Sequence, residues 1–506
     1  MSPERPAPAE PADLAARAAQ KHVVVVGGGV GGLVAARECA KVGMRVTLLE
    51  ASEALGGVIR KVALDGVVID AGAESYATKG GHVRALVDEL GLTDRVVTPQ
   101  AGGAWLAGLP GGGAAPLPAG GILGIPGNPF QDDVRRIIGW SGAWRAYLDR
   151  VRPPLTIGHQ LSLGRLVASR MGEKVRDRLV APVTTGVYSA SPDDVDIDVA
   201  APGLNAALTR VGSLSGAVLA LRGESASRGA KTPGAAVEGL VGGMSVLVDA
   251  LATDLDELGA TVRTGVRVRR LAVDGSAWRI VVEEPVGQEL LSSQDAVEGE
   301  MQETELDVDA VIVATSEHTA RALLAGPAPA LATADPAPAP EIEIVSLLLD
   351  APALRTPPRG TGVLTVPHSH TAKALTHSTA KWSWVREAAG DREVVRVSFG
   401  AQGEPAATAA LVDEAAIDLA RREASALLGV PLTADQVVAG HRGRFVQAQP
   451  ASIIGSGERR AAARQAVQAV PGLAAVGAWL AGTGLAQVVP DAVEEADRLR
   501  RALLWD

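Results

Sequence analysis

The chain has 506 residues, of which 47% are hydrophobic and 21% are charged, as in globular proteins that bury a large core, and its length predicts two or three domains. The formal net charge of −10 gives no support for nucleic-acid binding, which calls for a basic surface, and it weakens attraction to anionic membranes. Cys39 is the single cysteine, which excludes an intramolecular disulfide and favours a reducing, cytoplasmic location. The sequence has no zinc or iron–sulfur spacing, so we predict no metal site.

Residues 1–20 are rich in proline, alanine and charge. They lack the apolar core of a secretory signal, and such a composition is typical of segments that do not fold. We therefore predict a disordered N-terminal lead-in, with the first domain beginning near residue 21.

The most informative stretch is residues 22–57. Residues 23–26 form an unbroken apolar run, typical of a strand buried on both faces. Gly27, Gly29 and Gly32 then stand at G-x-G-x-x-G spacing, a helical segment covers 33–42, and a second apolar strand, 46–49, ends at Glu50. This order predicts a dinucleotide-binding βαβ unit, and the alternative is an ordinary glycine-rich turn.

The glycines have separate physical roles in such a unit. Gly27 permits the tight turn, Gly29 lets the backbone approach a pyrophosphate, and Gly32 lets the helix pack close to the sheet. The helix N-terminus offers free N–H groups to the phosphates. Glu50 can accept a hydrogen bond from a ribose hydroxyl but would repel a 2′-phosphate, which argues against NADP.

The pair Gly56-Gly57, shortly after Glu50, favours FAD over NAD. With this pair the chain resembles the FAD-dependent amine oxidase and protoporphyrinogen oxidase superfamily. Members of that superfamily carry an acid at the end of the second strand, followed by a Gly-Gly pair that passes close to the cofactor.

Residues 96–131 carry no formal charge and could be mistaken for a membrane span. Prolines break the hydrogen bonds of a helix interior, so we predict packed loops instead. An apolar pocket wall and a shallow membrane contact remain open as alternatives. The prolines are Pro110, Pro116, Pro118, Pro126 and Pro129.

The later segments alternate between strands and helices. We predict a mostly helical region over 135–180, interrupted at Pro153-Pro154, a helix that ends near 258, and a helix over 405–428. Strands are predicted at 261–271, 278–283, 308–314 and 341–349, with further strand material in 375–398 around Trp382 and Trp384. Loops are predicted over the acidic segment 284–308 and the Ala/Pro-rich connector 325–340.

Together these elements predict an α/β fold with a discontinuous, Rossmann-like FAD-binding domain at 21–75, 238–323 and 455–506. An α+β substrate domain is inserted at 76–237 and 324–454, and its part 111–204 is predicted to be a mostly helical subdomain.

Several later motifs resemble those of the bacterial protoporphyrinogen/coproporphyrinogen III oxidases of the Gram-positive type. They are 70–76 (DAGAESY), whose glycine-to-serine part runs beside the flavin in that family, 161–167 with 179–188, 360–364 with 373–382, and the closing motif 477–485. The chain departs from the family at His377, where Trp is common, at 445–456, where a Gly-His pair is replaced by Gly455-Ser456, and at 489–493.

The resemblance implies which residues contact FAD and substrate. The cofactor candidates are Gly27, Gly28, Gly29, Val30, Gly31, Gly32, Glu50, Ala51, Gly57, Val58, Gly72, Ala73, Glu74, Ser75, Val268, Gly484 and Leu485. The substrate candidates are Lys79, Tyr188, His377 and Lys381, each of which has a plain structural or surface role as its alternative.

The resemblance also implies an activity: oxidation of coproporphyrinogen III to coproporphyrin III, with dioxygen as acceptor and hydrogen peroxide as product. Protoporphyrinogen IX oxidation, a flavin amine oxidase or a carotenoid-type desaturase are enzyme alternatives, and a prenyl- or partner-binding relative without flavin is the non-enzyme alternative. We further expect a tetrapyrrole as the small-molecule ligand, a ferrochelatase as a candidate contact, no transmembrane segment, and at most a peripheral contact with membrane.

Overall fold

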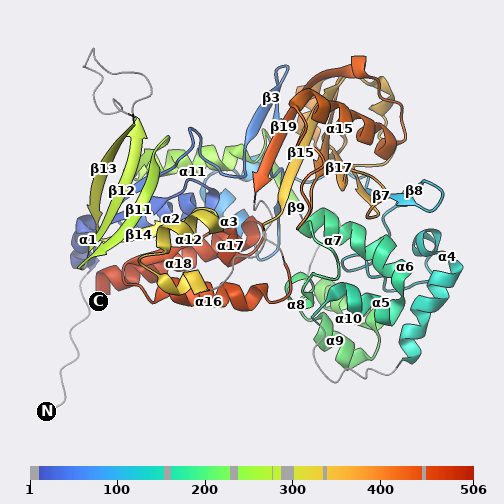
Figure 1. Cartoon of the computed structure of the whole chain (residues 1–506), viewed down its shortest axis with the longest axis horizontal. Coiled ribbons are helices and arrows are strands. Elements are labelled where there is room, and N and C mark those ends of the chain that lie inside the picture. The colour runs from blue at the N-terminus through green and yellow to red at the C-terminus, as the bar shows by residue number, and fades with distance from the viewer. Residues whose placement is uncertain are drawn as a thin grey trace.

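The computed structural model describes residues 11–152, 161–227, 237–275, 277–285, 301–333, 339–446 and 452–505. Figure 1 shows two halves: one is built on a parallel sheet and contains both chain ends of the described part, and the other combines an antiparallel sheet with a group of helices. We call them the parallel-sheet half and the mixed-sheet half.

The parallel sheet has five strands in the order β10-β2-β1-β14-β20. Its central strand, β1, is apolar and buried on both faces, as the run of valines predicts. The strands come from distant parts of the chain: β1 (His22–Val26), β2 (Arg45–Leu49), β10 (Thr261–Arg263), β14 (Ala310–Val313) and β20 (Leu473–Ala475). This confirms the Rossmann-like α/β prediction.

Alternate residues of these strands face two different layers. Val23, Val25 and Ile312 pack against helices on one face: α2 (Val30–Ala40), α3 (His82–Glu89), α11 (Ser245–Glu257) and α18 (Leu485–Trp505). Val24 and Val311 pack against the other layer, formed by an antiparallel sheet of β11 (Arg267–Asp274), β12 (Ala277–Pro285) and β13 (Met301–Val308) with α12 (Glu317–Leu324) and α16 (Ser456–Gln468).

Two predictions for this half were wrong. Residues 301–308, expected to be loop, form β13, because they pair with β12 from Trp278 to Pro285 despite their acidic character; residues 286–300 lie outside the described part. Residues 11–20, expected to be disordered, form helix α1 (Pro11–Gln20), whose Ala18 is buried in the core.

The mixed-sheet half contains seven strands in the order β19-β15-β18-β17-β16-β7-β8. Helix α15 (Asp413–Leu428) covers one face with an apolar core that includes Val345 and Leu427. The strands are β7 (Ala104–Leu109), β8 (Gly113–Pro116), β15 (Glu341–Leu349), β16 (Gly362–Thr365), β17 (Ala374–His377), β18 (Glu393–Phe399) and β19 (Val437–Val446).

Trp382 and Trp384 do not lie in a strand, contrary to the prediction. They flank and enter the short helices α13 (Ser378–Lys381) and α14 (Ser383–Ala389), between β17 and β18. Both indoles pack in a small apolar core with Val394 and with strands β3 (Lys61–Leu64) and β4 (Val67–Asp70). The two rings are therefore buried by tertiary packing. Aromatic residues are common in strands for the same reason, so the composition of this segment suggested a strand.

The helical region runs from α4 to α10 and has its own core, which includes Leu166 and Val218. The part 111–204, predicted to be mostly helical, holds strand β8 at its start and helices from α4 onward, and the helices continue past 204. Pro153-Pro154 lie outside the described residues. The helices are α4 (Asp132–Tyr147), η2 (Leu148–Val151), α5 (Leu163–Met171), α6 (Glu173–Val175), η3 (Arg176–Val180), α7 (Ala181–Tyr188), α8 (Ile197–Ala200), α9 (Leu204–Val211) and α10 (Leu214–Ser227).

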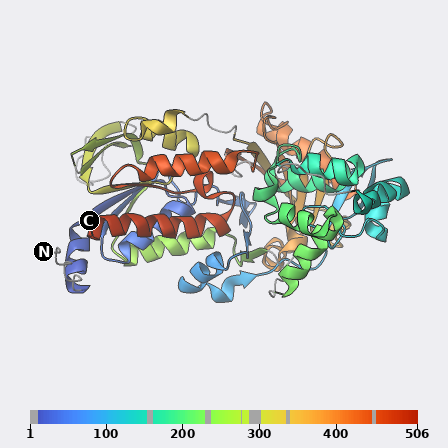
Figure 2. The same ribbon diagram turned by 90° about the horizontal axis from the view of Figure 1, so that it is seen from below.

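Short elements join the two halves. Strands β5 (Tyr76–Ala77), β9 (Val237–Leu240) and β6 (Val96–Val97) form a small sheet at the junction. The remaining elements are η1 (Thr93–Arg95), η4 (Pro329–Thr333), η5 (Pro352–Leu354), η6 (Ala434–Gln436) and α17 (Ala478–Ala481). Figure 2 shows α16 and α18 running side by side along the parallel-sheet half, where ion pairs from Arg464 to Asp491 and Glu495 connect them.

Within the described residues, no single helix has both the length and the apolar character needed to cross a membrane. One bent pair, Leu204–Val211 with Leu214–Glu224, meets the length and composition criteria together at an angle of 115°. The uncharged segment 96–131 forms β6, β7, β8 and the loops around them rather than a helix.

Candidate functional site

The first glycine loop joins β1 to α2. Gly27 has φ of 112°, and a Cβ there would lie 2.7 Å from the carbonyl oxygen of Ala314. A Cβ on Gly32 would lie 2.0 Å from the carbonyl oxygen of Gly27, whereas a Cβ on Gly29 would meet nothing within 4 Å. Gly27 and Gly32 are thus required by the backbone, and Gly29 borders open space of the kind that a pyrophosphate needs.

The second glycine pair lies against this loop. Gly29 and Gly56 form a parallel β-bridge, and the Gly56 N–H donates to the Gly28 carbonyl oxygen at 2.8 Å. A Cβ on Gly57 would lie 3.4 Å from the Cα of Gly29. The two glycine segments therefore form one wall, as the sequence order predicts for a bound dinucleotide.

Glu50 ends β2 beside this wall. Its Oε2 accepts from the Gly28 N–H at 2.7 Å, and its Oε1 accepts from the backbone and hydroxyl of Ser52 at 2.8 and 2.7 Å. These bonds fix the carboxylate at the strand end, beside the first glycine loop. The Val266 N–H donates to the Glu50 carbonyl oxygen at 2.9 Å, which ties the start of β11 to the end of β2. Val268 follows two residues later, on β11.

The segment 72–75 lies next to Val58. A Cβ on Gly72 would lie 2.0 Å from the Val58 carbonyl oxygen, so Gly72 allows the closest approach of the two chains. Ala73 is exposed and its N–H donates to the same oxygen at 3.5 Å. Ser75 is half-buried and precedes β5.

Glu74 is held by two cations from the mixed-sheet half. Lys381 Nζ lies 2.5 Å from its Oε1, and Arg396 donates to its Oε2 at 2.7 Å. Burial alone would raise the pKa of Glu74, but the charges of Lys381 and Arg396 lower it to about 2. Arg396 also donates to the carbonyl oxygens of Ala71 and Gly72. The carboxylate of Glu74 therefore anchors the segment, and the Lys381 ammonium is engaged by a protein partner.

His377 lies in a second buried ionic cluster. It is 0% exposed, and its Nε2 lies 3.1 Å from Glu393 Oε2. Glu393 also accepts from Thr379 at 2.6 Å and from Arg386. Burial would raise the pKa of Glu393, and these hydrogen bonds and the Arg386 charge hold it below its usual value. The structure thus gives His377 a structural contact, while the side chain of Tyr188 lies outside the described part.

The C-terminal motif meets the first helix. A Cβ on Gly31 would lie 3.1 Å from Val488 Cγ1 and 3.6 Å from the Cα of Gly477. Gly484 has φ of 93° and borders open space, and Leu485 begins α18. The N-termini of α2 and α18 are therefore close neighbours, which adds two sets of free N–H groups. We call residues 27–32, 50–58, 72–75 and 477–485 together the glycine edge.

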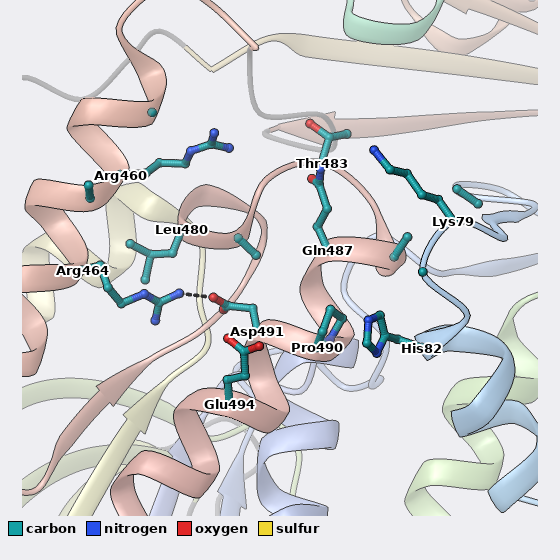
Figure 3. A pocket seen from close by; sticks show the side chains of 16 residues that line it. Lys79, His82, Arg460, Arg464, Leu480, Thr483, Gln487, Pro490, Asp491 and Glu494 are labelled. Atoms are coloured by element: carbon teal, nitrogen blue, oxygen red, sulfur yellow. Dashed lines mark hydrogen bonds and ion pairs between the residues drawn. The ribbon is translucent and has the colours of Figure 1, made fainter. Parts of the chain in front are cut away.

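A pocket of about 680 Å³ lies beside the glycine edge, between the loop 77–82, α16 and the first turns of α18. Figure 3 shows Lys79 and Arg460 reaching toward the same end of it from opposite walls, beside Thr483 and Gln487. Arg464, Asp491 and Glu494 lie toward the other end. Of the substrate candidates, Lys79 is the one that lines this pocket.

Sequence reasoning missed four residues that shape these sites. Arg396 and Arg460 sit in ordinary-looking strand and helix segments, and nothing in their local pattern distinguishes them, whereas Asp70 and Lys373 open the motifs 70–76 and 373–382 without being assigned a role. Asp70 accepts from the Met244 N–H at 2.9 Å and so fixes the start of α11; burial raises its pKa to about 7. Lys373 is buried, donates to Ser189 Oγ at 2.5 Å, and has its pKa lowered to about 7 by burial.

Comparison with known proteins agrees with this geometry. The model of the family described as flavin containing amine oxidoreductase matches residues 30–500. The chain therefore belongs to the flavin-containing amine oxidoreductases and is an oxidoreductase with FAD as its cofactor. The glycine edge fits FAD, because Gly29 and Gly484 border open space and the Glu50 carboxylate is fixed beside the first glycine loop.

Within that family the chain belongs to the protoporphyrinogen/coproporphyrinogen III oxidase branch. It is 31% identical over 492 residues to the coproporphyrinogen III oxidase of Mycobacterium tuberculosis, covering 94% of this chain and 95% of that protein. The coproporphyrinogen III oxidase of Bacillus subtilis is 25% identical over 494 residues, covering 94% and 96%.

The fold is also that of solved flavoproteins. A crystal structure from Exiguobacterium sp. 255-15, provisionally assigned as a protoporphyrinogen oxidase, superposes with a TM-score of 0.79 at 22% identity, covering 95% of this chain and 99% of that one. This similarity concerns the fold alone.

Proposed function

We propose that this chain oxidises coproporphyrinogen III to coproporphyrin III, with dioxygen as acceptor and hydrogen peroxide as product. The observation that carries the proposal is the 31% identity to the Mycobacterium tuberculosis coproporphyrinogen III oxidase over 94% of the chain. The FAD-compatible glycine edge supports it, since such an oxidation needs a hydride acceptor and no acid–base triad.

The reaction removes six hydrogens from the tetrapyrrole, in three two-electron steps. Bound FAD would supply the hydride acceptor for each step, one proton would leave the tetrapyrrole per step, and three dioxygen molecules would be reduced to three hydrogen peroxides overall. Aromatisation of the ring supplies the driving force. The protein has to position the substrate carbon at the flavin and keep water away.

We propose that FAD is held by the cofactor candidates of the glycine edge and by Val268. In this proposal Gly29 and the N-terminus of α2 bind the pyrophosphate, and Glu50 binds the ribose. Among the substrate candidates Lys79 has the best support, because it lines a pocket and makes no hydrogen bond or ion pair with a described residue. Lys381 and His377 have less support, since Glu74 and Glu393 already engage them.

We also propose the division of the chain into a cofactor domain at 21–75, 238–323 and 455–506 and a substrate domain at 76–237 and 324–454. The cytoplasm, with at most peripheral membrane contact, is the proposed location, and direct transfer of product to a ferrochelatase is the proposed partner contact. The lack of a spanning helix in the described residues is compatible with this location.

Porphyrin fluorescence tests the function directly. Purified, FAD-loaded protein is mixed in air with coproporphyrinogen III, and with protoporphyrinogen IX in a parallel reaction. We expect faster fluorescence growth with coproporphyrinogen III, with three peroxides formed per porphyrin. Faster oxidation of protoporphyrinogen IX would keep the chain a porphyrinogen oxidase but make protoporphyrinogen IX its substrate. Failure of both, from a yellow protein, would overturn the proposal and favour an amine or a polyene as substrate.

A matched variant ties the activity to the cofactor site. Glu50→Gln keeps the side-chain shape but removes the charge that accepts from Gly28 and Ser52, so we expect roughly ten-fold weaker FAD binding, in line with a charge-assisted hydrogen bond. Glu53→Gln, an exposed residue of the same loop, is the control. Unchanged FAD affinity in Glu50→Gln would remove Glu50 from the site.

A further inference from the structure

The pocket beside the glycine edge has one end with unpaired positive charge. Arg460 makes no hydrogen bond or ion pair with any residue that the structure describes. Burial lowers the pKa of Arg460, the charge of Asp196 raises it, and that of Arg459 lowers it. Lys79, on the facing wall, is exposed and likewise has no partner in the described ranges. A half-buried guanidinium without a carboxylate partner is costly, and it calls for an anionic ligand.

The other end of the pocket has the opposite character. Arg464 pairs with Asp491 and lies 3.4 Å from Glu495, so its charge is already compensated. Glu494 adds a further carboxylate to that end, and burial raises the pKa of Asp491. An anion entering the pocket is thus repelled from the end that holds Asp491 and Glu494 and directed to Lys79 and Arg460. His82, on the loop wall, is the remaining titratable group of the lining.

The walls of the positive end continue directly into the glycine edge. Lys79 follows Ser75 by one short strand, and Thr483 precedes Gly484 and Leu485. Gly482 lets the groups assemble, because a Cβ there would lie 3.0 Å from Arg460 Nη1 and 2.3 Å from Gln487 Oε1. A ligand held by Lys79 and Arg460 therefore lies next to the segments that border the cofactor.

We infer that this end is a carboxylate-binding subsite for the tetrapyrrole substrate, with Arg460 and Lys79 holding one propionate. The inference rests on the proposed function, because it takes the propionate-bearing porphyrinogen as the ligand. The planar guanidinium of Arg460 matches a carboxylate with two parallel hydrogen bonds, and Lys79 adds a point charge. Both are substrate-binding residues, and Arg460 has no counterpart among the positions that the sequence motifs single out.

The test compares a charged ligand with its neutral ester. Coproporphyrin III and coproporphyrin III tetramethyl ester are titrated against the FAD-loaded protein through the porphyrin absorption band, and KM and kcat are measured with coproporphyrinogen III. For Arg460→Gln and for Lys79→Gln we expect roughly ten-fold weaker binding of the acid and a similar rise in KM, the size of one charge-assisted contact, with kcat within about two-fold. Binding of the ester should not change.

Two further variants separate charge from folding. Arg460→Lys keeps a cation and should retain more of the affinity for the acid than Arg460→Gln. Arg501→Gln removes an exposed charge from the last turn of α18, where Arg501 pairs with Asp497, and should leave both affinities unchanged. The flavin spectrum and FAD content report whether each variant is folded.

The outcomes are distinct. Equal loss for acid and ester, or no loss for the acid, would overturn the subsite. Competition by succinate as strong as that by coproporphyrin III would assign the site to small free carboxylates and overturn the tetrapyrrole assignment. If the wild-type protein oxidises neither porphyrinogen but the acid-selective loss persists, the proposed reaction fails and the carboxylate subsite stands.

Discussion

The two halves of the molecule build the surroundings of the proposed cofactor site differently. The parallel-sheet half lines it with backbone: Gly27, Gly29, Gly32 and Gly57 bring main chain close to main chain and leave open space at Gly29. The mixed-sheet half contributes charged side chains, and most of them are already paired with the protein, as Lys381 and Arg396 are with Glu74. The glycine edge thus presents N–H groups to a ligand, whereas the ion pairs of Glu74 join the two halves.

Glu74 takes part both in the glycine edge, which is lined by backbone, and in the ion pairs made by the mixed-sheet half. We call these two kinds of contact the backbone mode and the ionic mode. Glu74 belongs to a glycine-edge segment by sequence, but its carboxylate binds cations that come from α13 and β18. Cofactor geometry and the junction between the halves are therefore coupled through one side chain. This coupling predicts that damage to the backbone mode abolishes cofactor binding, while damage to the ionic mode lowers stability first.

The largest expected effect comes from Gly32→Ala. Its Cβ would lie 2.0 Å from the Gly27 carbonyl oxygen and 3.0 Å from the Ala314 Cβ, so β1 and α2 cannot keep their present approach. We expect at least hundred-fold weaker FAD binding, or no soluble protein, because overpacking against backbone cannot relax. FAD content and flavin absorbance after purification measure this.

Gly223→Ala is the matched control for that variant. Gly223 lies inside α10, and a Cβ there would meet nothing within 4 Å. Since alanine favours helix over glycine by about 1 kcal/mol, this change should leave FAD content unchanged and raise the melting temperature slightly. A yellow, stable Gly32→Ala protein would contradict the backbone mode.

The next effect is expected from Glu74→Gln. It leaves the ammonium of Lys381 and the guanidinium of Arg396 without their carboxylate in a site where Glu74 and Arg396 are largely buried. Removing one partner of a buried ion pair costs about 3 kcal/mol or more. Denaturant unfolding measures the loss, and Asp391→Asn, whose partner Arg355 is on the surface, should change the free energy of unfolding by less than about 0.5 kcal/mol.

The ion pairs of Glu74 with Lys381 and Arg396 also predict that the free energy of unfolding falls at acid pH. The pKa of Glu74 is lowered to about 2 from its usual 4.5, so the stability it contributes is present above pH 4.5 and is lost as the pH falls toward 2. The difference in unfolding free energy between wild type and Glu74→Gln should shrink over that window. A difference that stays constant with pH would show that the charge of Glu74 does not contribute.

The contacts of the glycine edge could be predicted from the sequence, whereas the ion pairs between the two halves could not. The βαβ unit, Glu50 and the Gly56-Gly57 pair are close in sequence, so local spacing predicts their contacts. Arg396 and Lys381 reach Glu74 from more than 300 positions away in the chain, and no local pattern reports such a pair. The strand β13 and helix α1 were missed for the same reason, because the strand pairing of β13 with β12 and the packing of α1 against α18 depend on distant segments.

The smallest effect is expected at Lys373, a buried cation that lies outside the ionic clusters. Burial lowers its pKa from 10.5 to about 7, and its ammonium donates a hydrogen bond to Ser189 Oγ. Because the folded state disfavours the charged form, the protein loses stability as the pH falls from 10.5 to 7, and below 7 it bears the full cost of the charge. Lys373→Met should therefore stabilise the protein at pH 6, and this gain should fade as the pH rises toward 10.5.

Lys61→Met separates this effect from a general gain in hydrophobicity. Lys61 is exposed and lies 3.5 Å from the exposed Asp249, so its replacement should change stability little and without a slope between pH 7 and 10. Urea unfolding at pH 6, 8 and 10 supplies both comparisons. If Lys373→Met destabilises at pH 6, the ammonium has a compensating anion in the folded protein, and the mixed-sheet half would then contain a third paired ionic cluster rather than an isolated buried charge.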